Sequence, residues 1–80
     1  MEQIYVILED DPFLRQGDVI GVADSKASWE TMINKYYGKD VISTAKVEDV
    51  RDSGIEYIYT FYDDGVEVEI TIENYQLNQI

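Results

Sequence analysis

Carboxylates are the side chains of this sequence most able to do chemistry, because it contains neither histidine nor cysteine. A nucleophile activated by histidine is therefore excluded. The clusters Glu9-Asp10-Asp11 and Asp63-Asp64 could hold Ca²⁺ or Mg²⁺, but neither has the ligand spacing of an EF-hand loop. The sequence also lacks a phosphate-binding glycine motif and a zinc-ligand pattern. We therefore expect no metal, no cofactor and no enzymatic activity.

The richest arrangement of carboxylates lies in the stretch IEYIYTFYDDGVEVEITIE, residues 55–73. Asp64-Gly65 between two alternating runs predicts a β-hairpin with a type I′ turn. The turn sets the register, with Asp63 opposite Val66 and Tyr59 opposite Ile70. One face is then apolar, and the other is acidic. The acidic face is expected to carry Glu56, Ile58, Thr60 and Tyr62 against Glu67, Glu69, Thr71 and Glu73, with Glu56 opposite Glu73.

Net charge narrows the possible partners of this face. The chain has 17 acidic and six basic residues, a net charge of −11. Residues 48–73 contain nine acids and one base, so they carry −8 of that charge. Direct binding to nucleic acid or to an anionic membrane is excluded, because both are polyanions. Two interpretations stay open: the acidic face binds a basic partner, or it only keeps a β-rich chain soluble.

The remaining elements follow from hydrophobic periodicity. Residues 3–9 form a strand that is apolar on both faces, which predicts a central strand. Residues 18–23 predict a second strand, antiparallel to the first. The stretch DSKASWETMINKYYG predicts a helix with Asp24 or Ser25 as N-cap and Gly38 as C-cap. Its apolar stripe, expected to cover the sheet, consists of Trp29, Met32, Ile33 and Tyr36.

Three segments are less regular. Residues 41–47 could form a short edge strand, and EDVRDSG after them reads as a turn. The apolar phase moves to Tyr75 and Leu77 near the end of the chain, which suggests a bulge or a strand end. The loop DDPFLRQG places Phe13 and Leu14 at its tip, where they either fold back onto the core or form an exposed anchor for a partner.

These elements predict one domain spanning residues 1–80, in the order β-β-α-β-β-β. The expected fold class is α+β, with two layers: a mostly antiparallel sheet and one helix packed on one face. No apolar run is long enough for a membrane span, and the acidic N-terminus does not resemble a signal peptide. We therefore expect a cytoplasmic protein.

Two likenesses suggest a biological setting. IYVILEDD followed by DVIGVADSKASWETMINKYYG resembles small uncharacterised proteins of phages and mobile elements of Gram-positive bacteria, in which a hairpin ends in an IGVxDS stretch before a helix. DSGIEY and VEVEITIENYQLNQI resemble their C-terminal hairpin and tail. In size and charge the chain is also similar to phage inhibitors that mimic DNA, such as the uracil-DNA glycosylase inhibitor and anti-restriction and anti-CRISPR proteins. The likeness implies a bacterial host cell.

We therefore expect a phage-type acidic protein that inhibits a host nucleic-acid-binding defence protein by occupying its basic surface. The alternative is a structural or assembly protein that associates with itself through its sheet. The oligomeric state, monomer or dimer, stays open. Phe13 and Leu14 are secondary candidate anchors. The expected partner-binding residues are Glu56, Tyr62, Asp63, Asp64, Glu67, Glu69 and Glu73.

Overall fold

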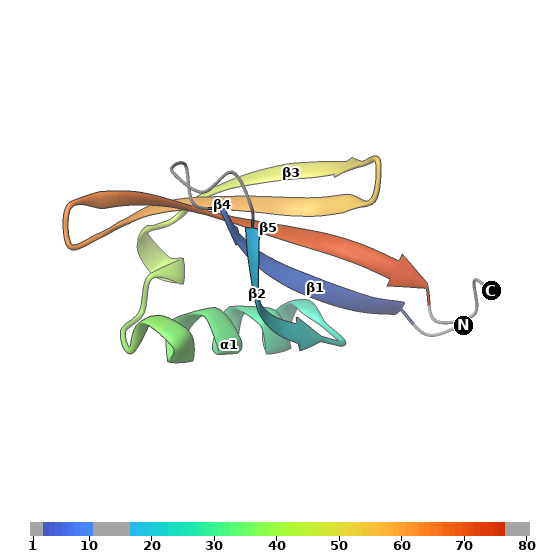
Figure 1. Ribbon diagram of the computed structural model, residues 1–80, viewed down its shortest axis with the longest axis horizontal. Helices are drawn as coiled ribbons and strands as arrows, with labels where there is room; N and C mark the ends of the chain where they lie inside the picture. The colour runs from blue at the N-terminus through green and yellow to red at the C-terminus, as the bar shows by residue number, and fades with distance from the viewer. Residues whose placement is uncertain (1–2, 11–16, 77–80) are drawn as a thin grey trace.

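A computed structural model describes residues 3–10 and 17–76 of the chain, which form an α+β fold of two layers (Figure 1). A five-stranded antiparallel sheet lies against the helix α1, and the strand order is β2-β1-β5-β4-β3. The predicted element order and the central position of the first strand are confirmed. The elements are β1 (Gln3–Asp10), β2 (Gly17–Ala23), α1 (Lys26–Tyr37), the short 3₁₀ helix η1 (Ile42–Thr44), β3 (Lys46–Asp52), β4 (Ile55–Asp63) and β5 (Val66–Gln76).

The β4–β5 hairpin has the predicted register. Asp63 lies opposite Val66, and Tyr59 lies opposite Ile70. Asp64 and Gly65 both have positive φ, at 51° and 78°, as a type I′ turn requires. A two-residue turn admits no other pairing of the strands that keeps the apolar side chains on one face.

One end of this hairpin departs from the expected pairing. Ile55, not Glu56, lies opposite Glu73, and Tyr57 lies opposite Ile72. Glu56 is therefore the extra residue of a β-bulge, and its carboxylate accepts a hydrogen bond from the side-chain amide of Asn74. The prediction that Glu56 faces Glu73 is wrong. The bulge removes a direct cross-strand pair of like charges, which would be destabilising.

The bulge suggested by the phase change is not found on β5, whose described part runs to Gln76. The β1–β5 pairing runs without interruption and places Tyr75 opposite Ile4, so the described part of β5 contains no bulge against β1. Tyr75 simply belongs to the opposite face of the sheet from Ile72. Leu77 lies outside the described residues.

Helix α1 begins and ends where the sequence predicts. The Ser25 hydroxyl accepts a hydrogen bond from the backbone N–H of Ser28 at 3.2 Å, and Gly38 has the left-handed φ of 72°. The buried stripe, however, is narrower than predicted: Trp29 and Ile33 are buried, but Met32 is 39 % and Tyr36 54 % exposed. These two side chains lie on the flank of the helix.

The core is organised around Tyr59, the largest fully buried side chain. Its hydroxyl accepts a hydrogen bond from Trp29 Nε1 at 2.9 Å and donates one to Glu30 Oε2 at 3.0 Å. Burial, with Glu30 as a further cause, raises the pKa of Tyr59 to about 12. The helix is thus fixed to the sheet by a hydrogen-bonded relay inside an aromatic cluster, in which Tyr5 packs on Trp29 with ring centroids 4.8 Å apart.

The segment between α1 and β4 differs from the prediction. Residues 42–44 are helical, and the strand begins only at Lys46 and continues to Asp52, through most of the stretch expected to be a turn. The reason is a side-chain cap from the helix: Asn34 Oδ1 accepts from the backbone N–H groups of Val41 and Ile42 at 2.9 and 3.1 Å. This contact bends the chain after the helix and buries Val41.

Candidate acidic interaction surface

The sheet has two faces of different character. Helix α1 covers one of them, and none of the described helices lies on the other, here called the open face (Figure 1). Cross-strand partners point to the same side of a sheet. The pairings therefore place one row on the open face, running from Lys46 through Thr60 and Glu69 to Asp10.

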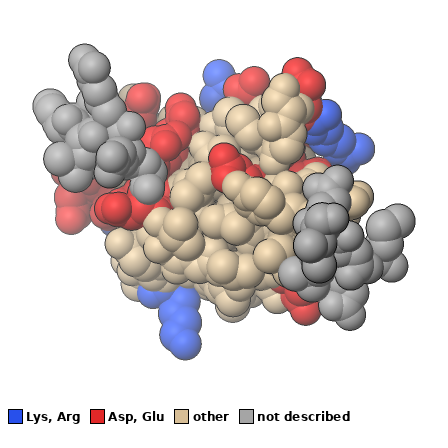
Figure 2. Space-filling view, turned by 45° about the vertical axis from the view of Figure 1, so that its right-hand side comes forward, with Lys and Arg blue, Asp and Glu red and all other residues tan. Residues whose placement is uncertain are grey.

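Carboxylates from three strands meet on this open face. Glu48 of β3 lies opposite Ile58 of β4, and Ile58 lies opposite Thr71 of β5. Glu69 and Glu73 are each two residues from Thr71 on β5, so they share its face. Among the described residues, Lys46 is the one basic side chain that the register places on this face. Figure 2 shows a group of acidic side chains at its left, and others at the top beside basic ones. The acidic patch consists of Asp10, Glu48, Glu67, Glu69 and Glu73.

The centre of the acidic patch is the cross-strand pair of Asp10 and Glu69. Asp10 accepts a hydrogen bond from the Thr71 hydroxyl at 3.2 Å, so it is held in place beside Glu69. Partial burial raises the pKa of Glu69 above its usual value of 4.5. The hydrogen bond between the Asp10 and Glu69 carboxyl groups and the negative charge of Asp10 raise the pKa further. Glu67 and Glu48 add to the repulsion. The patch is thus electrostatically strained when fully ionised.

A stability prediction follows from this strain. Since the pKa of folded Glu69 is raised, the folded state binds more protons than the unfolded state between that pKa and about 4.5. At neutral pH the ionised Glu69 side chain lowers the free energy of unfolding by its full amount. Protonation of Glu69, as the pH falls through the raised pKa, removes this loss of stability. We expect Glu69→Gln to raise the melting temperature at pH 7, and the gain to vanish as the pH falls to about 4.5. Thermal melts followed by circular dichroism across this range measure it.

The control is the neighbouring carboxylate. Asp10→Asn keeps an acceptor for the Thr71 hydroxyl but removes the charge. In the Asp10→Asn variant, Glu69→Gln should raise the melting temperature by less, because part of the repulsion is already absent. A gain from Glu69→Gln that is equal at pH 7 and at pH 4.5 would contradict this account of the pair.

An exposed aromatic residue borders the acidic patch. Tyr62 lies opposite Glu67 near the turn of the hairpin. Its side chain is 67 % exposed, and its hydroxyl donates to Glu67 Oε2 at 3.3 Å. A tyrosine in this position offers apolar area together with a polar tip, which is typical of residues that anchor protein interfaces.

The other predicted partner-binding residues are dispersed. Asp63 pairs with Lys39 at 2.7 Å and shares the helix-covered side with Phe61. Asp64 is exposed in the turn, and Glu56 is bound by Asn74. Glu73 is half-buried on the open face and accepts from the Tyr75 hydroxyl at 2.8 Å. Phe13 and Leu14 lie outside the described residues.

Two members of the acidic patch were not predicted. The sequence pattern predicts a loop at Asp10 and a turn at Glu48, but both residues lie within strands that flank the hairpin. No local pattern identifies them, because only the order of the strands brings them to the same face. The predicted core of the site, Glu67, Glu69 and Tyr62, does lie together.

No protein-family model, curated protein or solved structure matches the chain. The likeness to phage proteins therefore stays a prediction. Within residues 3–10 and 17–76, no cluster of three or more acidic side chains has the arrangement to hold a metal ion. Across the same residues, no helix combines the length and apolarity needed to cross a membrane.

Proposed function

We propose that this protein is an acidic inhibitor that binds a nucleic-acid-binding protein by occupying its basic surface. The observation that carries the proposal is the gathering of five carboxylates from β1, β3 and β5 on the open face, with Lys46 as the one base there among the described residues. A protein surface that binds nucleic acid presents Lys and Arg side chains, and this patch is complementary to it.

The geometry of the patch supports charge mimicry in particular. Glu67 and Glu69 are two residues apart on β5, so their Cα atoms are about 7 Å apart. This spacing is comparable to that of successive phosphates along a nucleic-acid strand. Opposite charges would accelerate encounter with the basic partner, and Tyr62 would supply a desolvated anchor at the edge of the contact.

The strain within the patch favours this interpretation over a role in solubility alone. Asp10 and Glu69 are cross-strand neighbours, and desolvation together with the hydrogen bond and charge of Asp10 raises the pKa of Glu69. Solubility requires only dispersed charge, whereas a binding surface for a polycation requires concentrated charge. Cations from a partner would relieve the repulsion, and that relief would add to the free energy of binding.

The test is competition. The protein is immobilised and used to capture a partner from bacterial lysate at low salt. The captured partner is then mixed with the nucleic acid that it binds. We expect added inhibitor to displace the nucleic acid, and expect its affinity to fall steeply with salt. Simultaneous binding of inhibitor and nucleic acid would refute the proposal.

Sedimentation addresses the alternative of self-assembly. Chains of charge −11 repel one another, so self-association should strengthen as salt screens the repulsion. We expect a monomer at both low and high salt. An oligomer that persists or strengthens at high salt would favour the assembly protein instead.

A further inference from the structure

The open face also carries an apolar region beside the acidic patch. Leu8 lies opposite Val19, and Val6 lies opposite Val22. Val19 is 61 % and Val22 50 % exposed, while Ile4, Val6 and Leu8 of β1 are half-buried. We call this region the apolar strip; it consists of Ile4, Val6, Leu8, Val19 and Val22.

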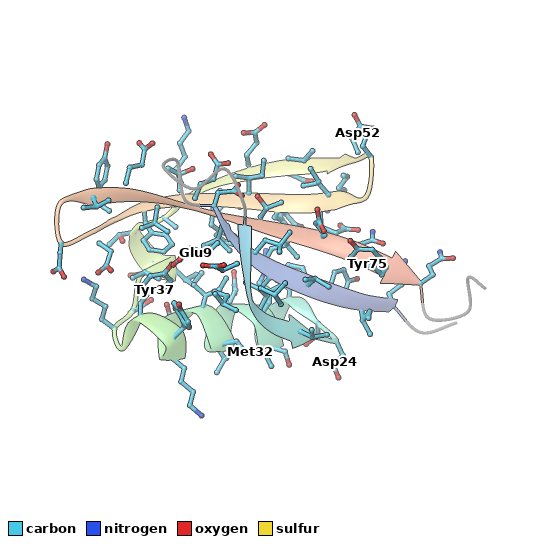
Figure 3. The ribbon with its side chains drawn as sticks, viewed as in Figure 1. Glu9, Asp24, Met32, Tyr37, Asp52 and Tyr75 are labelled. Atoms are coloured by element: carbon cyan, nitrogen blue, oxygen red, sulfur yellow. The ribbon has the colours of Figure 1, made fainter. Side chains whose placement is uncertain are left out.

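The apolar strip continues around the sheet edge. Ile4 and Val22 also line a shallow pocket together with Met32 of α1. Figure 3 shows Met32 on the helix near the end of β2, close to Asp24. The partly exposed Met32 thus extends the apolar strip from the open face to the flank of the helix, where Asp24 and Ser28 border the pocket.

The apolar strip and the acidic patch form one continuous surface. Leu8 and Asp10 are two residues apart on the same face of β1, and Val6 lies directly opposite Glu73. A partner that covers the strip therefore also approaches the carboxylates. Covering them without opposite charge would cost free energy, because buried carboxylates need paired cations.

This adjacency selects among the possible occupants. A second copy of the chain would bring a charge of −11 against −11, and an anionic lipid surface would be repelled for the same reason. An apolar segment without cations would leave the acidic patch unpaired. The occupant that satisfies both regions carries Lys or Arg beside apolar side chains.

Dimensions favour a helix. The strip covers two adjacent strands about 4.8 Å apart, so with its side chains it is about as wide as the 10 Å diameter of a helix. From Ile4 to Asp10 the surface extends for six residues, or about 20 Å, the length of a helix of about 14 residues. The opposite face of the sheet is already covered by a helix of similar length, α1.

We propose that the open face binds a basic amphipathic helix of the partner, with apolar side chains on the strip and Lys or Arg on the acidic patch. This inference rests on the proposed function and specifies its partner. It adds a contribution to binding that does not depend on salt, because burial of apolar area is not screened.

Two synthetic peptides test the proposal. One is a 14-residue Leu/Lys peptide with helical amphipathic spacing, and the other has Ser in place of every Leu and the same charge. Binding of the labelled peptides to the full chain is measured by fluorescence anisotropy at low and high salt. We expect the Leu/Lys peptide to bind more than about tenfold more tightly and to retain measurable binding at high salt.

Matched variants locate the contact. Val19→Thr with Val22→Thr keeps the β-branched shape but replaces two exposed methyl groups by hydroxyls. This double substitution should lower the affinity for the Leu/Lys peptide by about fivefold or more. The Ser/Lys peptide should be unaffected. Val66→Thr is the control, because Val66 is similarly exposed at 57 % but lies opposite Asp63, away from the open face.

The possible results separate the two proposals. Equal affinities for the two peptides, or no effect of the paired Thr substitutions, would overturn the helix proposal. The proposed function would still stand if the partner binds in a salt-dependent way and substitution of Glu67 and Glu69 weakens that binding. If the paired Thr substitutions instead dissociate a dimer in sedimentation, the strip is a self-association surface and the helix proposal is wrong.

Discussion

Replacing Tyr59 with alanine is expected to unfold most of the chain at room temperature. Tyr59 has no exposed surface, and its hydroxyl joins Trp29 to Glu30. Loss of a core aromatic costs about 3–5 kcal/mol, and the change also leaves the buried Trp29 N–H without its acceptor, which costs about 1–3 kcal/mol. An 80-residue domain has only about 4–12 kcal/mol of total stability. Urea titration followed by tryptophan fluorescence measures the loss.

Two substitutions divide this effect into its parts. Tyr59→Phe retains the ring and removes only the hydroxyl, so we expect a folded protein that is less stable by about 1–3 kcal/mol. Tyr62→Ala removes an exposed ring instead and should change stability by less than about 0.5 kcal/mol. If Tyr59→Ala melts within a few degrees of the parent, the relay does not hold the helix to the sheet.

The second large effect concerns binding. Replacing Glu67 and Glu69 together with glutamine is expected to weaken partner binding by more than tenfold, or about 1.4 kcal/mol. Both residues lie on the open face, next to Tyr62 and Asp10, where each would contact Lys or Arg of the partner. The fold should be unchanged or more stable by a few tenths of a kcal/mol, because repulsion is removed. Titration calorimetry with the captured partner measures the affinity.

A control with the same change of net charge distinguishes local contact from long-range attraction. Asp40→Asn with Asp49→Asn removes two exposed carboxylates outside the acidic patch and the apolar strip, and the amide oxygen introduced by Asp40→Asn can still accept the hydrogen bonds from Asn34 and Ser43. We expect this pair to slow association slightly and to leave dissociation unchanged. If both pairs weaken binding equally, the partner responds to total charge and the patch has no specific role.

The hairpin at the centre of the sheet was predictable from local sequence. Asp64-Gly65 permits the tight turn, and strict alternation on both sides leaves one register that buries the apolar face. The same reasoning correctly predicted the caps of α1, because Ser25 and Gly38 act on their own backbone neighbourhood. It placed Glu67, Glu69 and Tyr62 together, because they lie on one face of a single hairpin.

The tertiary structure decided the composition of the surface around that hairpin. The pairing of β1 with β5 joins residues about 60 or more positions apart, and no periodicity records which strand becomes the neighbour. That pairing brings Asp10 to the acidic patch and Ile4, Val6 and Leu8 to the open face. The bulge at Glu56 and the cap from Asn34 likewise depend on partners outside their own strand or helix. Local pattern determines which face a side chain occupies on its own strand, whereas packing of the whole sheet determines which side chains become its neighbours.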